Sequence, residues 1–274
     1  MAAHPDSSGT ELSMSWFEEW FNHPLYLEVY SHRDNNEAAL CVQTILACSG
    51  LNMKKTESLS VLDIACGAGR HALEFAKLGY RVTGNDLSPY LLKEAEKMAQ
   101  QSNLPLQLTC YDMRQIPSNG MYNLVVQLFT SFGYFTMKED DQLVLSKAYN
   151  ALQADGWYIL DLINPPHLIR NLVAHSCRTA GELTIVEDRA FIEERITKTI
   201  TIIPPVGQSV TFSESVKLYN KEEIIAMLQK EGFTVTSILG NYNGDSFRDE
   251  ESPRMMIFCQ KLSVAAINPQ PLYP

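Results

Sequence analysis

A glycine turn limits the folds open to this chain. It lies in the segment VLDIACGAGRHA at residues 61–72, where a short apolar strand carries Asp63, Gly67 and Gly69 form the turn, and a helix is expected to follow. Glycine adopts positive φ without steric cost and lets a ligand approach the backbone closely. The first turn of a helix adds unpaired N–H groups. This unit predicts a nucleotide-like ligand at the carboxyl end of a parallel sheet.

Apolar strands and helices alternate around this turn. We expect strands at residues 60–64, 80–84, 106–110, 122–128 and 157–162, and helices at 71–78, 88–101 and 140–152. Such alternation implies parallel strands joined by right-handed crossovers. Two further helical segments, at residues 16–30 and 35–49, precede the first strand, and Pro24 is expected to break the first of them.

The pattern changes after residues 164–166. Residues 183–191, 195–203 and 209–219 are rich in Thr, Val and Ile and predict an antiparallel insertion of three strands. A helix at 221–231 and strands at 235–239 and 255–261 then resume the core. The expected organisation is a disordered tail (1–15), an N-terminal helical cap (16–50), the α/β core (51–164), the insertion as lid or dimer contact (165–220), the closing helix and last two strands (221–262), and a tail (263–274).

The glycines alone leave two ligand classes open. Gly67, Gly69 and Ala72 also satisfy the GxGxx(G/A) pattern of dinucleotide-binding proteins. Asp63 distinguishes the two classes, because a carboxylate four residues before the first glycine would repel a pyrophosphate in the turn. The same carboxylate would attract an ammonium group.

Two more acids follow the next two strands. Asp86 comes 17 residues after Gly69 and can accept hydrogen bonds from the vicinal hydroxyls of a ribose. Asp112, in the sequence YDMR, can accept a hydrogen bond from the amino group of an adenine. Together with Asp63, these acids favour a ligand that carries an ammonium group, a ribose and an adenine.

The segments VLDIACGAGRHA, NDLS and YDM resemble three motifs of the class I, Rossmann-like, S-adenosylmethionine-dependent methyltransferases of the small-molecule type. The resemblance covers residues 59–162, and the later elements up to residue 261 agree with it. It implies an α/β fold, a three-layer Rossmann-like sandwich whose seven-stranded, mostly parallel sheet has an antiparallel last strand. It also implies S-adenosylmethionine as the cofactor and transfer of its methyl group to an O or N atom of a small molecule.

The resemblance assigns cofactor-binding residues. The first acid and the glycines would hold the methionine part, Asp86 the ribose, and Asp112 with Met113 the adenine. In related enzymes a leading helical segment covers the ligand, so Tyr30 is included, and Arg33 is included as a clamp on the methionine carboxylate. The alternative is that this segment is a purely structural cap. The full set of candidates is Asp63, Ala65, Gly67, Gly69, Arg70, Asp86, Leu87, Asp112, Met113, Gln127, Tyr30 and Arg33.

The segment QLFTSFGYF at residues 127–135 follows the fourth strand, where the family places the reactive methyl group. It is similar to a segment of methyltransferases that dimethylate amino sugars. Its aromatic residues would wall the sulfonium and the acceptor, or would belong to the core. The candidate substrate residues are Tyr26, Phe129, Phe132, Asn164, Tyr242 and Arg254.

Methyl transfer from a sulfonium depends mainly on in-line positioning and desolvation. A base is needed only where the nucleophile carries a proton of high pKa. The candidate catalytic residues are Tyr134, His167 and Asp161. For His167 the alternative is an exposed loop position, and for Asp161 the alternative roles are orienting the substrate or a purely structural one.

Composition disfavours several partners. The 22 Lys and Arg residues against 32 Asp and Glu residues give a formal net charge of −10, so a nucleic acid is not expected as substrate. No apolar run approaches the ~18 residues that span a bilayer, and residues 1–10 lack the pattern of a secretory signal. The six scattered cysteines are expected to be reduced and no metal site is expected. These features favour a cytoplasmic protein with a small-molecule acceptor, no membrane partner, and a homodimer as its expected assembly.

Two rival functions stay open at this point. An NAD-dependent oxidoreductase would use the same glycine turn, but it is disfavoured by Asp63, by Asp112 and by the lack of a recognisable Tyr-x-x-x-Lys pair. A non-catalytic S-adenosylmethionine-binding module would keep the same cofactor residues.

Overall fold

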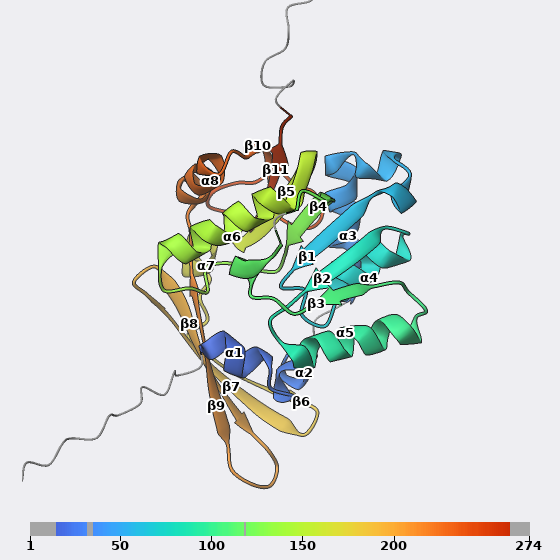
Figure 1. Cartoon of the computed structure of the whole chain (residues 1–274). Coiled ribbons are helices and arrows are strands. Elements are labelled where there is room, and N and C mark those ends of the chain that lie inside the picture. The colour runs from blue at the N-terminus through green and yellow to red at the C-terminus, as the bar shows by residue number, and fades with distance from the viewer. Residues whose placement is uncertain (1–14, 32–34, 118, 264–274) are drawn as a thin grey trace, which may run out of the picture.

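The computed structural model describes residues 15–31, 35–117 and 119–263. They form a seven-stranded sheet between helical layers, and a four-stranded antiparallel sheet that projects from it (Figure 1). The order of the larger sheet is β10-β11-β5-β4-β1-β2-β3, and β11 is antiparallel to both of its neighbours. The expected α/β class, with a mostly parallel sheet and an antiparallel last strand, is confirmed.

The strands of the larger sheet are β1 (Ser60–Ile64), β2 (Arg81–Asn85), β3 (Gln107–Thr109), β4 (Tyr122–Gln127), β5 (Leu152–Ile163), β10 (Thr234–Leu239) and β11 (Arg254–Lys261). The α-helices are α1 (Trp16–Phe21), α2 (Leu25–Val29), α3 (Asn35–Ser49), α4 (Arg70–Lys77), α5 (Pro89–Gln101), α6 (Lys138–Ala151), α7 (Pro165–Arg170) and α8 (Lys221–Lys230). Three short 3₁₀ turns are η1 (Leu51–Met53), η2 (Thr56–Ser58) and η3 (Met113–Gln115).

Strand β1 lies at the centre of the sheet and places the glycine turn. It pairs in parallel with β2 on one side and β4 on the other, so that Asp63 lies opposite Gly84 and Val126. The chain runs outward from β1 in both directions, which makes the β1–β4 border the point where the strand order reverses. Ligands of open α/β sheets bind beyond the carboxyl ends of the strands at such a point.

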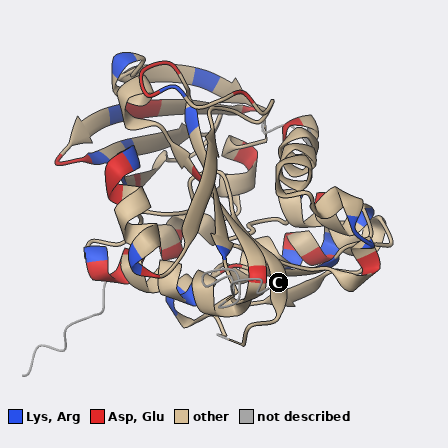
Figure 2. Cartoon of the chain, turned by 90° about the horizontal axis from the view of Figure 1, so that it is seen from above, with Lys and Arg blue, Asp and Glu red and all other residues tan. Residues whose placement is uncertain are grey.

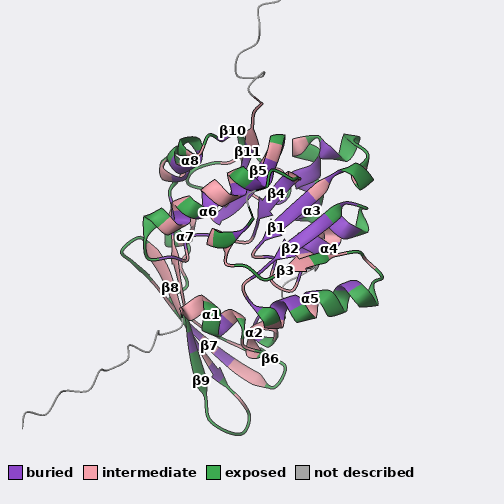
Figure 3. Ribbon diagram, viewed as in Figure 1, coloured by how far each residue is buried: buried purple, intermediate pink, exposed green. Residues whose placement is uncertain are grey.

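Side chains along the central strands alternate between two cores, as period-2 strands require. Val61 packs with helices α3 and α4 on one face, whereas Leu62 packs with α6 and α8 on the other. Figure 3 shows these strands as buried and the outward sides of the helices as exposed. Burial on both faces explains the continuous apolar runs that identified the strands from the sequence.

The antiparallel sheet has four strands instead of the three expected. Its order is β6-β7-β8-β9, with β6 at His175–Ala180, β7 at Leu183–Ile192, β8 at Arg195–Ile203 and β9 at Val210–Lys217. Strand β6 was missed because its sequence, HSCRTA, carries no Val, Ile or aromatic residue that marks a strand. One face of this sheet packs its apolar residues against helices α1 and α2.

A helix also replaces part of the loop expected after β5. Asn164 precedes α7, and prolines occupy its first two positions, where the missing N–H groups cost nothing. His167 therefore lies half-buried on a helix and not in an exposed loop. Within the three ranges that the structure describes, no helix combines the length and the apolar character needed to cross a membrane.

Candidate active site

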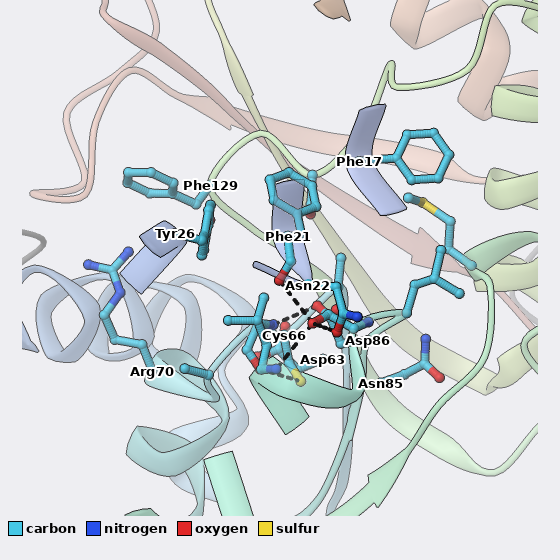
Figure 4. A pocket seen from close by; sticks show the side chains of 18 of the residues that line it. Phe17, Phe21, Asn22, Tyr26, Asp63, Cys66, Arg70, Asn85, Asp86 and Phe129 are labelled. Carbon is cyan, nitrogen blue, oxygen red and sulfur yellow. Dashed lines mark hydrogen bonds between the residues drawn. The ribbon is translucent and has the colours of Figure 1, made fainter. Parts of the chain in front are cut away.

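A cavity of about 470 Å³ lies beyond the carboxyl ends of β1 and β2. Its floor is the glycine turn, and its walls are the loops that follow β2, β3 and β4. Helices α1 and α2 cover it with Phe17, Phe21 and Tyr26 (Figure 4), and Tyr30, which directly follows α2, also lines it. Mostly apolar walls with a few convergent polar groups are typical of a small-molecule site.

Two glycines with left-handed backbone shape the turn at the floor of this cavity. Gly67 and Gly69 have φ of 57° and 80°, which glycine adopts without strain. A Cβ on Gly69 would lie 3.1 Å from the Cβ of Ala95, which is tighter than an ordinary contact, so glycine lets helix α5 pack closely against the turn. Gly69 caps the N-terminus of α4, whose first residue, Arg70, also lines the cavity.

Asp63 is buried beneath the cavity with one oxygen unsatisfied. Its Oδ2 has no hydrogen-bond partner in the part of the chain that the structure describes, although the residue is only 2% exposed. Burial, together with the negative charge of Asp86, raises the pKa of Asp63 to about 8. A buried carboxyl group of this kind gains a large amount of interaction energy when a cation is placed beside it.

Asp86 joins the glycine turn to the start of helix α5. Its Oδ2 accepts a hydrogen bond from the N–H of Gly67 at 2.8 Å, and its Oδ1 accepts one from the N–H of Ser88 at 2.8 Å. Burial raises the pKa of Asp86, and these two N–H groups oppose the rise. A carboxylate oxygen has more than one lone pair, so Asp86 retains acceptor capacity toward the cavity that it lines.

The loop after β3 forms another wall. Asp112 accepts hydrogen bonds from the backbone N–H of Arg114 at 2.8 Å and from its Nη2 at 2.6 Å. Burial alone would raise the pKa of Asp112, but Arg114 outweighs it and the pKa is lowered. Asn85 holds the same loop, because its Nδ2 donates to the carbonyl oxygen of Tyr111 at 2.9 Å. Met113 lines the cavity beside Asp112.

Helices α1 and α2, which we call the cap, are fastened to two other elements. Asn22 Oδ1 accepts a hydrogen bond from the N–H of Tyr90 at 3.2 Å, which ties the cap to helix α5. Glu214 of β9 accepts hydrogen bonds from Trp20 Nε1 at 2.8 Å and from the hydroxyl of Tyr30 at 2.6 Å. The four-stranded sheet therefore supports the cap from behind.

Charged residues of both signs gather on the face of the four-stranded sheet that meets the cap. Lys198 forms an ion pair with Glu214 at 2.7 Å, and Arg178 donates to the backbone oxygen of Val29 at 2.7 Å. Figure 2 shows basic and acidic residues on the strands of this sheet. Lys198 also donates to the hydroxyl of Tyr30, so these partly buried charged residues connect the sheet to the segment above the cavity.

The loop after β4 supplies aromatic rings. Phe129, Tyr134 and Phe135 line the cavity. The ring of Tyr134 packs against Trp16 at 5.1 Å and Phe21 at 5.7 Å between centroids, so the cap and this loop form one aromatic surface.

Comparison with known proteins agrees with this geometry. Residues 61–156 match the family model described as a methyltransferase domain. This segment is a methyltransferase domain. The chain has the Rossmann-like fold of class I S-adenosylmethionine-dependent methyltransferases. Its structure is similar to that of a methyltransferase from Clostridium acetobutylicum, with a TM-score of 0.75 and 17% sequence identity, and the match covers 89% of this chain and 98% of that one.

Curated relatives include further methyltransferases. The putative methyltransferase YqeM of Bacillus subtilis is 31% identical over 103 residues, 37% of this chain and 41% of the relative. A dTDP-4-amino-2,3,4,6-tetradeoxy-D-glucose N,N-dimethyltransferase of Saccharopolyspora spinosa is 22% identical over 80% of this chain and 88% of the relative. The chain thus spans only about two fifths of the length of the first relatives, YqeM among them.

Twelve predicted site residues of the methyltransferase domain and its cap line the cavity together. They are Tyr26, Tyr30, Asp63, Ala65, Gly67, Arg70, Asp86, Leu87, Asp112, Met113, Phe129 and Tyr134. Gly69 is not in the wall itself, but it lies in the turn between two wall residues, Ala68 and Arg70. Arg33 lies outside the described residues.

Seven other predicted site residues lie away from the cavity wall, and polar contacts or core packing explain most of these positions. Gln127 donates to the carbonyl oxygen of Ser131 at 2.6 Å and accepts from Tyr158 at 2.8 Å. Asn164 donates to two backbone oxygens, each at 2.7 Å, in the loop before β11. The other five are Phe132, which is in the core, His167 on α7, and the mutually bonded Asp161, Tyr242 and Arg254.

Sequence reasoning missed six residues of the segment 17–31 that line the cavity, and these are Phe17, Glu18, Phe21, Asn22, Leu27 and Ser31. Phe17 and Phe21 are four residues apart and therefore share one face of α1. Trp20 lies on another face and packs on Phe212 with ring centroids 4.3 Å apart. The spacing of the aromatic residues was the available signal, since it indicates a helix with two apolar faces.

Proposed function

We propose that this chain transfers a methyl group from S-adenosylmethionine to an O or N atom of a small-molecule acceptor. The observation that carries the proposal is Asp63, whose buried Oδ2 lacks a partner among the described residues and lies in the wall of the cavity. The ammonium group of a methionine moiety would satisfy this oxygen, whereas the pyrophosphate of NAD offers no positive charge to pair with it.

The remaining wall fits the other parts of the same ligand. Asp86 would accept hydrogen bonds from the ribose hydroxyls, and the apolar side of the cavity at Met113 would hold the adenine beside Asp112. The volume of about 470 Å³ is within the usual range for sites that enclose a drug-sized ligand. The cap closes over these residues and would exclude water from them.

S-adenosylmethionine supplies an activated methyl group, so the chain need only orient the acceptor and exclude water. Among the three predicted catalytic residues, only Tyr134 lines the cavity. We therefore assign to Tyr134 the role of orienting the acceptor nucleophile through its hydroxyl. Asp161 is bonded inside the core and His167 lies on α7, so neither is proposed as a base.

The acceptor and the assembly belong to the same proposal. Relatives named as amino-sugar N,N-dimethyltransferases support a small acceptor with an amine, and the net charge of −10 favours such a molecule over a nucleic acid. All six cysteines are free, which supports a reducing, cytoplasmic location. We propose the four-stranded sheet as the site of a homodimer contact.

Binding and turnover test the proposal separately. Calorimetry with S-adenosylmethionine, S-adenosylhomocysteine and NAD should show micromolar binding of the first two only. Asp86→Ala should weaken binding by about 1–3 kcal/mol, because the ribose hydroxyls lose their acceptor, and Glu96→Gln, on the exposed side of α5, should not weaken it. Tight binding of NAD alone would refute the proposal.

A screen with labelled S-adenosylmethionine tests turnover. It should transfer label to amines or hydroxyls among amino sugars, amino acids and other small metabolites. Binding without transfer to any O, N, S or C acceptor would favour the non-catalytic module.

A further inference from the structure

The loop after β4 holds an unusual backbone conformation next to the cavity. Phe129 and Thr130 are consecutive non-glycine residues with φ of 58° and 62°. Left-handed φ is rare for a residue with a Cβ and exceptional for a β-branched one such as Thr. Strained backbone of this kind persists only where surrounding groups hold it, and it concentrates at functional sites.

Asp161 of β5 accepts hydrogen bonds from both of these residues and so stabilises their conformation. Its Oδ2 accepts a hydrogen bond from the N–H of Phe129 at 2.8 Å, and its backbone oxygen accepts one from the N–H of Thr130 at 3.0 Å. The Asp161 side chain is fully buried, with 0% exposure. One residue thus receives both N–H groups of the strained pair.

Asp161 is itself held from the neighbouring strand. Arg254 of β11 donates from Nε to Oδ1 at 2.6 Å and from Nη2 to Oδ2 at 2.9 Å, and its Nη2 lies 2.9 Å from Thr130 Oγ1. The hydroxyl of Tyr242 donates to Oδ2 at 2.7 Å. Neither Asp161, Arg254 nor Tyr242 is in the cavity wall, so none of them is placed to contact a ligand there.

The strained backbone directs the ring of Phe129 into the cavity wall. Figure 4 shows this ring beside Tyr26, on the same side of the cavity as Arg70. The guanidinium carbons of Arg70 and Arg254 lie 5.0 and 5.4 Å from the ring centroid. Two cations within about 6 Å of one ring are each attracted by its π-system and restrict its position.

We propose that Asp161 is a positioning residue that holds the ring of Phe129 in the cavity wall, and that Arg254 orients the Asp161 carboxylate. Asp161 then affects ligand binding only through Phe129. This inference rests on the proposed function, because the ring is taken to contact bound S-adenosylmethionine or S-adenosylhomocysteine.

The test compares two variants that remove the ion pair without leaving a buried charge alone, since an unpaired buried charge would itself be strongly destabilising. Asp161→Asn/Arg254→Met keeps a side-chain oxygen that can accept the hydrogen bond from Phe129. Asp161→Leu/Arg254→Met removes that acceptor. Each is made in the wild-type background and with Phe129→Leu, and the affinity for S-adenosylhomocysteine is measured by calorimetry.

The leucine-containing pair should bind S-adenosylhomocysteine about 5- to 10-fold more weakly than wild type, within the coupling range of contacting residues. The asparagine-containing pair should stay within about twofold of wild type. In the Phe129→Leu background neither pair should weaken binding further. Circular dichroism and thermal unfolding verify folding. Leu228→Ala on α8 controls for lost stability, because Leu228 is fully buried and does not itself line the cavity.

The inference would be overturned if Asp161→Leu/Arg254→Met bound S-adenosylhomocysteine as tightly as wild type. It would also be overturned if this double substitution still weakened binding in the Phe129→Leu background, or if Phe129→Leu alone left the affinity unchanged. If the leucine-containing pair does not fold, Asp161→Ala/Arg254→Met replaces it as the acceptor-free variant. A wild-type chain that binds neither S-adenosylmethionine nor S-adenosylhomocysteine would refute the proposed function and the inference with it. Wild-type binding without coupling to Phe129 would refute the inference alone.

Discussion

Lowering the pH should weaken the binding of S-adenosylhomocysteine through Asp63. The pKa of this buried carboxyl group is raised to about 8, so it carries a proton at neutral pH in the empty chain. It must lose that proton to pair with the ammonium group of the ligand. Each pH unit below about 7 therefore costs about 1.4 kcal/mol, or a factor of about ten in affinity. The α-amino group of the ligand has a pKa of about 8, so the affinity should be highest near that pH.

Calorimetry in buffers of different ionisation enthalpy measures this linkage. At pH 6 to 7 binding should release close to one proton. Asp63→Asn should bind more weakly at pH 7, with no release of that proton and no slope of affinity with pH, whereas Glu96→Gln should behave as wild type. Affinity that does not change between pH 5.5 and 7, or equal proton release in Asp63→Asn, would refute the assignment of Asp63 to the ammonium group.

The same group should limit the stability of the empty chain. The folded-state pKa of Asp63, about 8, exceeds the ordinary value of 3.8. The stability associated with the protonated group is complete below about pH 4 and is lost as the pH rises through about 8. Asp63→Asn should therefore unfold at higher urea concentration than wild type at pH 8, with a gain of roughly 2–5 kcal/mol, and should show no gain at pH 4. A lower stability at pH 8 would contradict the buried, unsatisfied state of Asp63.

Three further predictions concern the framework of the cavity. Gly133→Ala should lower stability by roughly 2–4 kcal/mol in thermal unfolding, because φ is +85° and a Cβ would clash with the carbonyl oxygen of Lys217; unchanged stability would show that the loop can shift. Asp141 has a pKa raised to about 6, mainly by burial, so its stabilising protonated form is lost as the pH rises from about 4 through 6. Asp141→Asn keeps an acceptor for the hydroxyl of Tyr219. In urea titrations it should stabilise the chain by roughly 1–3 kcal/mol at pH 8 but not at pH 4. Equal effects at both pH values would show that the ionisation of Asp141 is not the cause. Glu214→Ala removes the carboxylate that accepts hydrogen bonds from both Trp20 and Tyr30. Stopped-flow fluorescence should therefore show that S-adenosylhomocysteine is released about 3- to 10-fold faster. An unchanged release rate would mean that the cap does not control release.

Much of the cofactor side of the site could be predicted from the sequence, because its residues lie in short motifs at the ends of consecutive strands. Asp63 lies near the carboxyl end of β1, Asp86 directly follows β2 and Met113 lies in the segment after β3, and parallel strands bring these ends to one edge of the sheet. The spacing of these residues along the sequence was therefore enough to predict that they lie together in the fold.

The acceptor side could not be predicted in the same way. Asp161 lies near the carboxyl end of an apolar strand just as Asp63 does, but an arginine 93 residues later in the chain pairs with its carboxylate. No local pattern shows that β11 will pair with β5 and bring Arg254 to that carboxylate. The cap aromatics of α1 posed a similar difficulty, since periodicity alone does not indicate which face of a helix meets a ligand and which meets a second sheet.

A crystal structure of the chain grown with S-adenosylhomocysteine tests the central claim most directly. We expect the ligand in the cavity beneath the cap, with its ammonium group at Asp63 Oδ2, its ribose hydroxyls at Asp86, and its adenine beside Met113. The sulfur should face Tyr134 and Phe129. Density for the ligand at any other place, or an amino group directed away from Asp63, would contradict the account.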